Sequence, residues 1–498
     1  MDLLRKKRVE DLLSQGADEG TGLRKRLGPV DLTGLGVGVV IGTGIFTLTG
    51  IEAKNHAGPA VVISFLIAGA VALLAGLCYA ELASGVPTAG SAYSYAYVSL
   101  GELVAWIIGW DMILEFALGA AVVARGWSGY LQNLFSLPPS LFGDEATVNV
   151  GAMAITLVLG VVAALGIRES ARVTNALVII KVAICLFIII AGAFFVKLSN
   201  WSPFVPESAG SVNAPQGSER TVAQAVFGLP PEAFGIGGIL TAAAVVFFAY
   251  SGFEAVANMS EETRKPSRDL PLGLLGTLAI ATVLYMGVAI VVTGMVSYGQ
   301  LDVDSPLASA FDTVGASWAG TLISIAAVAG LTSVILVCII TMGRIGFAMA
   351  RDGLLPRSVG AIHPRFGTPV RITAAMTVAV TLLSGFVSLE SLANLVSIGT
   401  LFAFLIVSAA IPILRRTEAG IKRPFRVPWS PFIPILSMLA CLYLMTNLTI
   451  ATWLRFAAWL ALGLLIYLLY GYRHARLSQG GRSAGPEKVG LSKGGART

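Results

Sequence analysis

The stretch that decides the fold is Leu35-Gly-Val-Gly-Val-Val-Ile-Gly-Thr-Gly-Ile-Phe46, in the middle of a long apolar segment. Its glycines fit two interpretations. In the first, small residues let neighbouring helices pack closely. In the second, the helix unwinds at Gly42-Thr43-Gly44 and frees backbone N–H groups, which suit a carboxylate at the start of a half-helix. Within hydrocarbon, such freed groups are tolerated only where they line a cavity.

The composition places this stretch in a membrane protein. Of the 498 residues, 55% are hydrophobic and 12% are charged, and the mean hydropathy is +0.80. Soluble domains are about 25% charged. These values exclude a large soluble protein. They also exclude nucleic-acid binding as the main function and a coiled coil as the main structure. The four cysteines lie singly in apolar runs and predict neither a disulfide nor a metal site.

Apolar stretches long enough to span a bilayer occur twelve times along the chain. They cover residues 30–49, 59–83, 103–125, 149–166, 173–196, 237–259, 272–296, 318–343, 370–389, 393–414, 431–448 and 452–470. The sequence therefore predicts an all-α polytopic membrane protein with twelve transmembrane helices. We expect an N-terminal segment (1–29), a single transmembrane domain (30–472) and a disordered tail (473–498).

Positive charge predicts the orientation of these spans. Most of the 34 lysines and arginines fall in the N-terminal segment, in the loops after the fourth, sixth, eighth and tenth spans, and in the C-terminal tail. Cytoplasmic loops are enriched in these residues. We therefore expect a multi-pass protein of the plasma (inner) membrane with both termini in the cytoplasm. The charged start of the chain predicts no cleavable signal.

A second interruption lies in the sixth stretch, at Val246-Phe-Phe-Ala-Tyr-Ser-Gly-Phe-Glu254. Corresponding interruptions in two halves of a transporter indicate inverted repeats around a binding site at the bilayer midplane. The N–H groups of the first break would receive a carboxylate. The carbonyl groups of Phe248, Ala249 and Ser251 would receive an ammonium group. Together the two breaks predict a receptor for a zwitterion.

Five motifs carry a resemblance to a known family. They are Gly42-Thr-Gly-Ile-Phe46, Cys78-Tyr-Ala-Glu-Leu-Ala-Ser-Gly-Val-Pro-Thr-Ala-Gly-Ser-Ala-Tyr-Ser-Tyr95, Gly109-Trp-Asp-Met-Ile-Leu-Glu115, Phe248-Ala-Tyr-Ser-Gly-Phe-Glu254 and Ala348-Met-Ala-Arg-Asp-Gly-Leu-Leu355. The chain resembles the amino acid–polyamine–organocation superfamily and, within it, the cationic amino acid transporters and their bacterial relatives. The resemblance implies a five-plus-five inverted-repeat fold like that of the leucine transporter, with discontinuous helices 1 and 6 and two additional spans. It also implies secondary transport of amino acids.

Lys181 lies deep in the fifth stretch, where an ionisable residue costs roughly 2.5–3.5 kcal/mol on insertion. Either its side chain snorkels toward the interface, or it faces the bundle and exchanges a proton because burial disfavours the charged form. Sodium-coupled relatives of the implied fold hold a sodium ion in this region. The resemblance therefore implies that the Lys181 ammonium replaces sodium and that transport is coupled to protons.

Two acidic residues lie on one face of the third stretch, Asp111 one turn before Glu115. Each is either a structural hydrogen-bonded acid or a functional group. For Glu115 the functional alternatives are a network with Lys181 and contact with a cationic substrate side chain. The resemblance implies a transport role for Glu115 and leaves these two alternatives open.

Four other residues near the breaks have two interpretations each. Glu254 either caps the second half-helix or takes part in gating or coupling, and Phe248 is either a lid over the substrate or a packing residue. Thr332 and Ser333 bond either the first span or Lys181, or a carbonyl of their own helix.

Two sets of residues are expected to form the site. The substrate-binding set is Gly42, Thr43, Gly44, Ile45, Phe248, Ala249, Ser251, Glu254 and Cys338, and the coupling set is Lys181, Glu115, Thr332 and Ser333. Cys338 enters only through the resemblance, as a small side chain at the far end of the pocket.

The leading hypothesis is a proton-coupled amino acid symporter that works by alternating access. The alternative is a potential-driven uniporter or exchanger of cationic amino acids, since one positive charge gains about 2.3 kcal/mol at −100 mV. From another class, a non-transporting amino acid sensor stays open. An enzyme is not expected, because the three histidines fall in loops or tails and no nucleophile–base pair is visible. The expected partners are an amino acid, protons and the lipid bilayer, with no cofactor, no metal and a monomeric transport unit.

Overall fold

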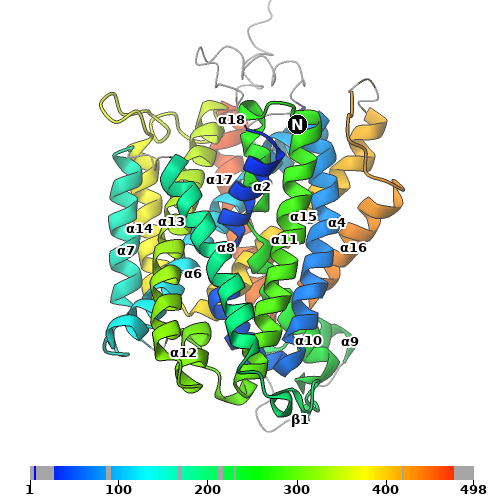
Figure 1. Ribbon diagram of the computed structural model, residues 1–498. Coiled ribbons are helices and arrows are strands. Elements are labelled where there is room, and N and C mark those ends of the chain that lie inside the picture. Colours follow the sequence, from blue (N-terminus) through cyan, green and yellow to red (C-terminus); the bar gives the residue numbers. More distant parts are fainter. Residues whose placement is uncertain are drawn as a thin grey trace, which may run out of the picture.

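The computed structural model describes residues 5–6, 27–85, 91–144, 146–166, 171–210, 217–228, 232–417, 420 and 422–475. In these ranges the chain is mostly helical, and the long helices lie side by side in one bundle (Figure 1). The predicted N-terminal segment (1–29) and tail (473–498) fall largely outside the described residues.

Each of the twelve predicted apolar stretches overlaps a helix. The longer helices are α4 (Val61–Gly85), α6 (Glu102–Phe135), α8 (Ala171–Ala193), α10 (Gly235–Val246, continued by 3-10 turns), α11 (Pro266–Met295), α13 (Ser317–Arg351), α15 (Leu389–Thr417) and α17 (Ile450–Ile466). The shorter apolar helices are α2 (Pro29–Val40), α7 (Val150–Ala164), α14 (Val370–Phe386) and α16 (Phe432–Thr446). Within the described ranges, eight helical segments are long and apolar enough to cross a membrane by themselves.

The outward faces of these helices are apolar. On α8, for example, Ile179 and Ile190 are 67% and 63% exposed, and on α11 Val283 is 71% exposed. A soluble monomer rarely exposes large apolar patches. A bilayer solvates such a surface, so the packing agrees with the membrane assignment made from the composition.

Short elements join the helices. They are α5 (Ser91–Ser99), α9 (Val222–Phe227), α12 (Pro306–Thr313), α18 (Tyr472–His474), the 3-10 turns η3 (Gly58–Ala60), η4 (Leu198–Trp201), η5 (Gly217–Glu219) and η8 (Tyr298–Gln300), and the π-helical turn η9 (Tyr467–Gly471). One short pair of strands lies outside the helical bundle. Strands β1 (Ala209–Gly210) and β2 (Glu232–Ala233) pair antiparallel in the connection between α8 and α10, with Ala209 opposite Ala233.

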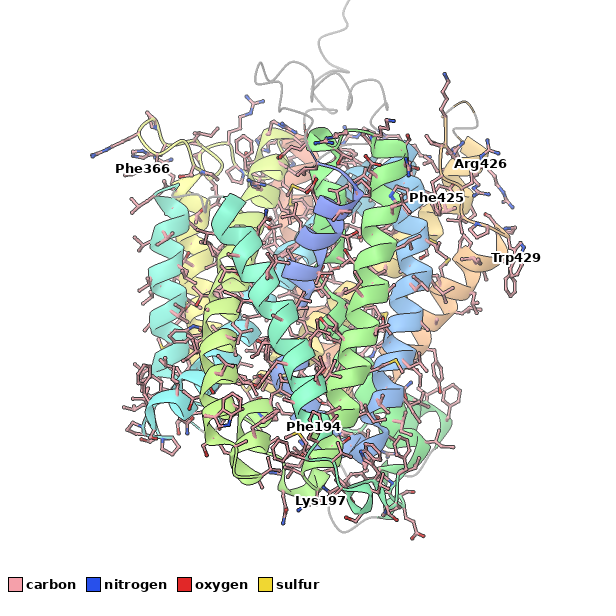
Figure 2. The ribbon with its side chains drawn as sticks, in the orientation of Figure 1. Phe194, Lys197, Phe366, Phe425, Arg426 and Trp429 are labelled. Carbon is pink, nitrogen blue, oxygen red and sulfur yellow. The ribbon has the colours of Figure 1, made fainter. Side chains whose placement is uncertain are left out.

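The two ends of the bundle carry different loops. Figure 2 shows Phe366 and Arg426 at one end and Lys197 at the other. Phe366 and Arg426 belong to the loops after the predicted eighth and tenth spans, and Lys197 belongs to the loop after the fifth. If each predicted span crosses the bundle once, loops after even-numbered spans lie at one end and loops after odd-numbered spans at the other, as observed here.

Glu81 is a buried ion-pair partner in the structure. Its carboxylate accepts hydrogen bonds from Arg415 Nε at 2.9 Å and Arg415 Nη2 at 2.6 Å, and from the N–H of Val427 at 2.7 Å. Glu81 therefore joins the end of α4 to the end of α15 and to the segment after it.

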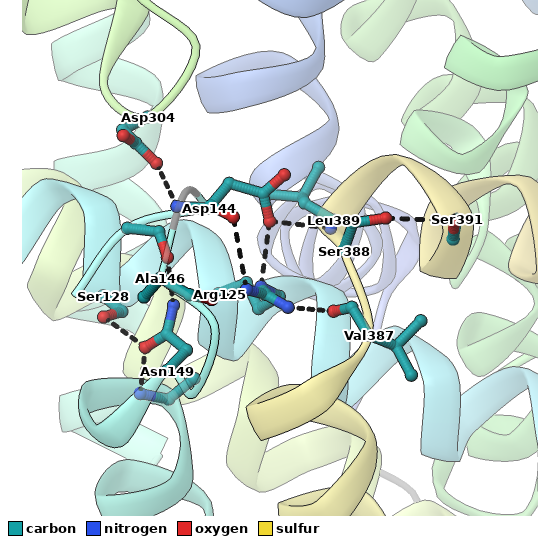
Figure 3. A network of polar contacts seen from close by, with 12 residues as sticks. Arg125, Ser128, Asp144, Ala146, Asn149, Asp304, Val387, Ser388, Leu389 and Ser391 are labelled. Atoms are coloured by element: carbon teal, nitrogen blue, oxygen red, sulfur yellow. Dashed lines mark hydrogen bonds and ion pairs between the residues drawn. The ribbon is translucent and has the colours of Figure 1, made fainter. Parts of the chain in front are cut away.

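A polar network near the C-terminal end of α6 joins four segments (Figure 3). Arg125 is buried on α6, and its Nε lies 2.9 Å from Asp144 Oδ1 in the following loop. Its Nη1 donates to the Val387 carbonyl, and Asp144 Oδ1 accepts from Leu389 N at 2.8 Å at the turn from α14 to α15. Asp304, just before α12, accepts from the N–H of Asp144. One arginine thus holds the α6–α7 loop, the α14–α15 turn and the segment before α12 together.

Two helices of the bundle are interrupted. α2 ends at Val40, Ile41 and Gly42 are not helical, and the chain continues as the π-helical turn η1 (Gly44–Leu48), then α3 (Thr49–Glu52) and the π-helical turn η2 (Ala53–Ala57). In Figure 1, α2 therefore occupies only the upper half of the bundle. The break lies one residue earlier than the Gly42–Gly44 stretch predicted from the sequence.

The second interruption follows α10. After Val246 the chain forms the 3-10 turn η6 (Phe247–Tyr250), turns at Ser251 and Gly252, and continues as the 3-10 segment η7 (Phe253–Glu262). Gly252 has a φ of +98°, a left-handed conformation that favours glycine. The Ser-Gly pair identified in the sequence is the point at which this helix changes direction.

Candidate substrate site

The two interrupted segments touch each other. A Cβ atom added to Gly44 would lie 2.4 Å from Ala249 Cβ, and one added to Gly252 would lie 2.8 Å from Val39 Cγ1. Carbon atoms in contact normally keep about 3.5–4.0 Å apart. The glycines at both breaks therefore permit an approach that any side chain would prevent.

A small cavity lies where the two breaks meet α6 and α13. The residues that line it are Val39, Val40, Gly42, Thr43, Gly44, Glu115, Phe116, Gly119, Val123, Phe248, Ala249, Ser251, Gly252, Val334 and Cys338. Backbone of both breaks thus faces one space, and most of the side chains around it are apolar. Glu115 is the charged residue in this lining.

The first break presents unpaired backbone donors to the cavity. Within the described part of the chain, the N–H groups of Gly42, Thr43 and Gly44 have no hydrogen-bond acceptor, because the helical pattern stops at Val40 and resumes with acceptance by Gly42 O from Ile45 N. Buried N–H groups are almost always paired. Three consecutive exceptions at residues that line a cavity could donate to an anionic group.

Three carbonyl groups in and beside the same break accept hydrogen bonds from side chains. Lys181 Nζ on α8 donates to Gly38 O at 2.7 Å, and Tyr285 OH on α11 donates to Val40 O at 2.7 Å. Farther along, Tyr130 OH on α6 donates to Phe46 O at 2.6 Å. Side chains from three helices therefore satisfy acceptors of the broken helix, and its donors are left for a ligand.

The second break offers acceptors. Phe248 O accepts from Ser251 N at 3.0 Å and Ala249 O accepts from Tyr285 OH at 3.0 Å, which leaves each carbonyl one lone pair. The Glu254 carboxylate accepts from the N–H of Gly252 at 3.0 and 3.2 Å, so it caps the second segment. Of the two interpretations of Glu254, the structure shows the capping contact.

Glu115 lies between the second break and α15. Its Oε1 accepts hydrogen bonds from Ser251 Oγ and from Thr400 Oγ1, both at 2.7 Å. The predicted network with Lys181 is not the one observed, because these two hydroxyls take the contacts. Asp111, one turn earlier on α6, is fully buried, and neither of its carboxylate oxygens has a hydrogen-bond partner among the described residues.

Lys181 faces the bundle rather than the interface. It is 1% exposed, its Nζ reaches Gly38 just before the first break, and its methylene groups lie against Gly330 of α13. The bundle-facing interpretation therefore fits, and the snorkelling interpretation does not. Lys181 is not part of the cavity lining, so it meets the site through the α2 backbone.

Of the two interpretations of Thr332 and Ser333, the structure shows the contact within their own helix. Thr332 Oγ1 donates to Val328 O at 2.7 Å and accepts from Trp127 Nε1 at 3.0 Å, and Ser333 Oγ donates to Gly330 O at 2.8 Å. Hydroxyl groups in apolar helices commonly bond the preceding turn. That bond is available within the helix itself, whereas contact with the first span or Lys181 requires a second element in place.

The structure divides the predicted residues into two groups. Those around the cavity are Gly42, Thr43, Gly44, Glu115, Phe248, Ala249, Ser251 and Cys338, and those outside its lining are Ile45, Glu254, Lys181, Thr332 and Ser333. Three further residues near the breaks are not predicted from the sequence: Tyr130, Tyr285 and Thr400. Their only signal was a polar group inside an apolar span, which does not reveal the partner.

Comparison with known proteins shows the family of this chain. The amino acid permease family matches residues 27–468 of the chain. A methylthioribose transporter of Bacillus subtilis (strain 168) is 42% identical over 487 residues, covering 96% of this chain and 99% of that protein. The branched-chain amino acid permease BcaP of the same organism is 40% identical over 490 residues, with the same coverage.

Eukaryotic transporters are similar over a shorter length. The vacuolar cationic amino acid transporter 4 of Arabidopsis thaliana is 37% identical over 422 residues, which cover 83% of this chain and 67% of that protein. These relatives are transporters and not enzymes. The family match spans nearly the whole membrane region and includes both broken helices. This chain is therefore a multi-pass membrane transporter that belongs to the amino acid permease family.

Proposed function

We propose that this protein is a secondary transporter that carries L-amino acids across the plasma membrane by alternating access. In this proposal it has twelve spans, ten of them in a five-plus-five inverted repeat, and both termini lie in the cytoplasm. The observation that carries the proposal is the set of three unpaired N–H groups at Gly42, Thr43 and Gly44. These three residues line the same cavity as Phe248, Ala249 and Ser251 of the second break. The arrangement suits a group with a carboxylate at one end and an ammonium at the other.

The side-chain end of the cavity favours a neutral substrate. Phe116, Val123, Val334 and Cys338 supply an apolar wall, and Gly119 leaves room beside it. Apolar surface stabilises a bound aliphatic side chain by roughly 25 cal/mol per Å² buried. We therefore propose small and branched aliphatic amino acids as substrates. The relative named as a branched-chain amino acid permease supports this choice.

Glu115 favours a second candidate, a uniporter or exchanger of cationic amino acids. A carboxylate beside the cavity would attract a guanidinium or ammonium side chain, and relatives named as cationic amino acid transporters exist. Against this candidate, Glu115 Oε1 already accepts from Ser251 and Thr400. We therefore propose Glu115 as a group that holds the second break in place.

We propose proton coupling through Lys181. Its ammonium lies on Gly38 O, at the end of the half-helix that must move when the site opens. Loss of the proton removes the charge from this contact, and a hydrogen bond with a charged donor is roughly twice as strong as a neutral one. Protonation therefore favours one position of α2, which couples proton transfer to substrate access. The transport unit in this proposal is a monomer.

The test is uptake into proteoliposomes without sodium. Labelled alanine, leucine and arginine are offered with an inward proton gradient, and separately with an inside-negative potential. The variants are Lys181→Ala and, as a matched control, Lys197→Ala, since Lys197 is exposed in a loop. We expect alanine or leucine to accumulate with the proton gradient, and only Lys181→Ala to lose this accumulation.

Other outcomes would replace the proposal. Arginine uptake on potential alone, with Lys181→Ala indifferent, would establish the cationic uniporter. Binding of an amino acid without flux in any condition would indicate a sensor. Uptake of methylthioribose but of no amino acid would refute the zwitterion receptor.

A further inference from the structure

One tyrosine hydroxyl contacts both interrupted helices. Tyr285 OH on α11 lies 2.7 Å from Val40 O, at the end of α2, and 3.0 Å from Ala249 O in the unwound turn η6. Tyr285 is fully buried. Helical backbone hydrogen bonds run within one helix, so they do not hold the two breaks to each other.

The contact is a bifurcated hydrogen bond, in which one O–H group meets two acceptors. A phenol has one O–H donor, and here two carbonyl oxygens point at it. Without the hydroxyl, two partly negative carbonyl oxygens would face each other in a buried, poorly screened space with no donor between them. The contact therefore draws the two breaks together at the point where Gly44 packs on Ala249.

The distance between the breaks sets the spacing of the site. The unpaired N–H groups begin two residues after Val40, and the carbonyls proposed to receive an ammonium are those of Phe248 and Ala249. In an α-amino acid the two charged groups are attached to one carbon atom. In a β-amino acid an additional methylene separates them.

We propose that Tyr285 is a positioning residue that holds the two breaks in register, so that the site accepts an α-amino acid and rejects a β-amino acid. This inference rests on the proposed function. It extends that function from the class of substrate to the spacing between the substrate's carboxylate and ammonium groups. Tyr285 does not line the cavity and acts through the backbone of the residues that do.

Tyr250 provides a matched control. It is also fully buried, its ring lies 5.4 Å from that of Tyr285, and its hydroxyl donates to a carbonyl at 2.8 Å. That carbonyl belongs to Phe65 in the regular helix α4. Tyr250→Phe therefore removes the same group from the same environment without releasing the contact between the breaks.

The experiment measures binding of L-alanine and of β-alanine to purified protein, by competition against labelled L-alanine. The wild type, Tyr285→Phe and Tyr250→Phe are compared, with the melting temperature of each as a measure of folding. For Tyr285→Phe we expect the Kd for L-alanine to rise about tenfold, equivalent to about 1.4 kcal/mol. We also expect the preference for L-alanine over β-alanine to fall at least about fivefold. Tyr250→Phe should keep the wild-type preference even if it melts at a lower temperature.

Gly44→Ala tests the same register from the other side. Its methyl group would meet Ala249 Cβ at 2.4 Å and push the breaks apart with Tyr285 intact, so the same loss of preference is expected. A wild-type preference in both Tyr285→Phe and Gly44→Ala would overturn the inference and leave the transporter proposal standing. If the wild type binds no amino acid, the proposed function fails and the inference fails with it.

Discussion

Replacing Asp144 by alanine should destabilise the end of the bundle where α6 meets the α14–α15 turn. The carboxylate lies 2.9 Å from Arg125 Nε and accepts the N–H of Leu389 at 2.8 Å (Figure 3). The substitution leaves the guanidinium of Arg125, only 2% exposed, without its nearest counter-charge. It also leaves the Leu389 N–H unpaired.

The magnitude follows from these distances. Two unit charges 2.9 Å apart attract by about 6 kcal/mol at an effective dielectric constant of 20. Two facts reduce the loss. Asp144 is 21% exposed, so water screens the pair, and Asp304 supplies a second negative charge beside Asp144. Breaking a buried pair by removing one partner costs roughly 3–5 kcal/mol. We therefore expect the free energy of unfolding to fall by about 2–4 kcal/mol, slightly less than for a fully buried pair.

The assay is thermal unfolding of the purified protein in detergent. With an unfolding entropy of about 2.1 cal/mol/K per residue, a membrane domain of this length loses roughly 1 °C of melting temperature per kcal/mol. The expected fall is about 2–4 °C for Asp144→Ala. Glu207→Ala, which removes an exposed loop carboxylate, is the control and should leave the melting temperature unchanged.

A second variant separates charge from shape. Arg125→Met combined with Asp144→Ala removes the uncompensated guanidinium, so the double variant should melt above Asp144→Ala alone. An equal melting temperature for Asp144→Ala and Glu207→Ala would refute the role given to the ion pair. That role is also refuted if the double variant melts no higher than Asp144→Ala.

Three further predictions concern the site. Uptake of alanine should be unchanged when sodium is replaced by choline, because Lys181 occupies Gly38 O; a sodium requirement in transport assays would contradict this. Asp111→Asn should not lower the melting temperature by more than about 1 °C, because neither carboxylate oxygen has a described hydrogen-bond partner to lose. Cys338→Leu should raise the KM for leucine at least about tenfold and that for alanine much less, because a longer side chain fills the apolar end of the cavity; equal effects on both substrates would show that Cys338 does not border the side chain.

The interrupted helices were the most predictable part of the fold. Apolar stretches of spanning length mark the helices, and small residues in the centre of two corresponding stretches mark the breaks, because paired interruptions are typical of transporter binding sites. The structure places the interruptions at Ile41–Gly42 and at Ser251–Gly252. Local sequence was sufficient here because the signal for a break and the break itself lie in the same few residues.

Contacts between distant residues were not predictable in the same way. Glu115 was correctly singled out as a buried acid, but its partners Ser251 and Thr400 come from two other elements. A hydroxyl inside a span always has its own helix as an available partner. Thr332 and Ser333 take that partner and Thr400 does not, and nothing in the sequence around these residues distinguishes the two outcomes.

The polarity of the first break is the feature that connects fold to function. An unwound turn frees both donors and acceptors, and a site with both free would attract water and cations as readily as a carboxylate. Here Lys181 and Tyr285 occupy acceptors on the side of α2, so the unpaired groups that face the cavity at Gly42–Gly44 are donors. Buried donors without partners are costly, so an acceptor group of a ligand would be stabilised at Gly42–Gly44. A bound carboxylate removes that cost, and the same helices that supply Lys181 and Tyr285 then experience the change through the backbone of α2.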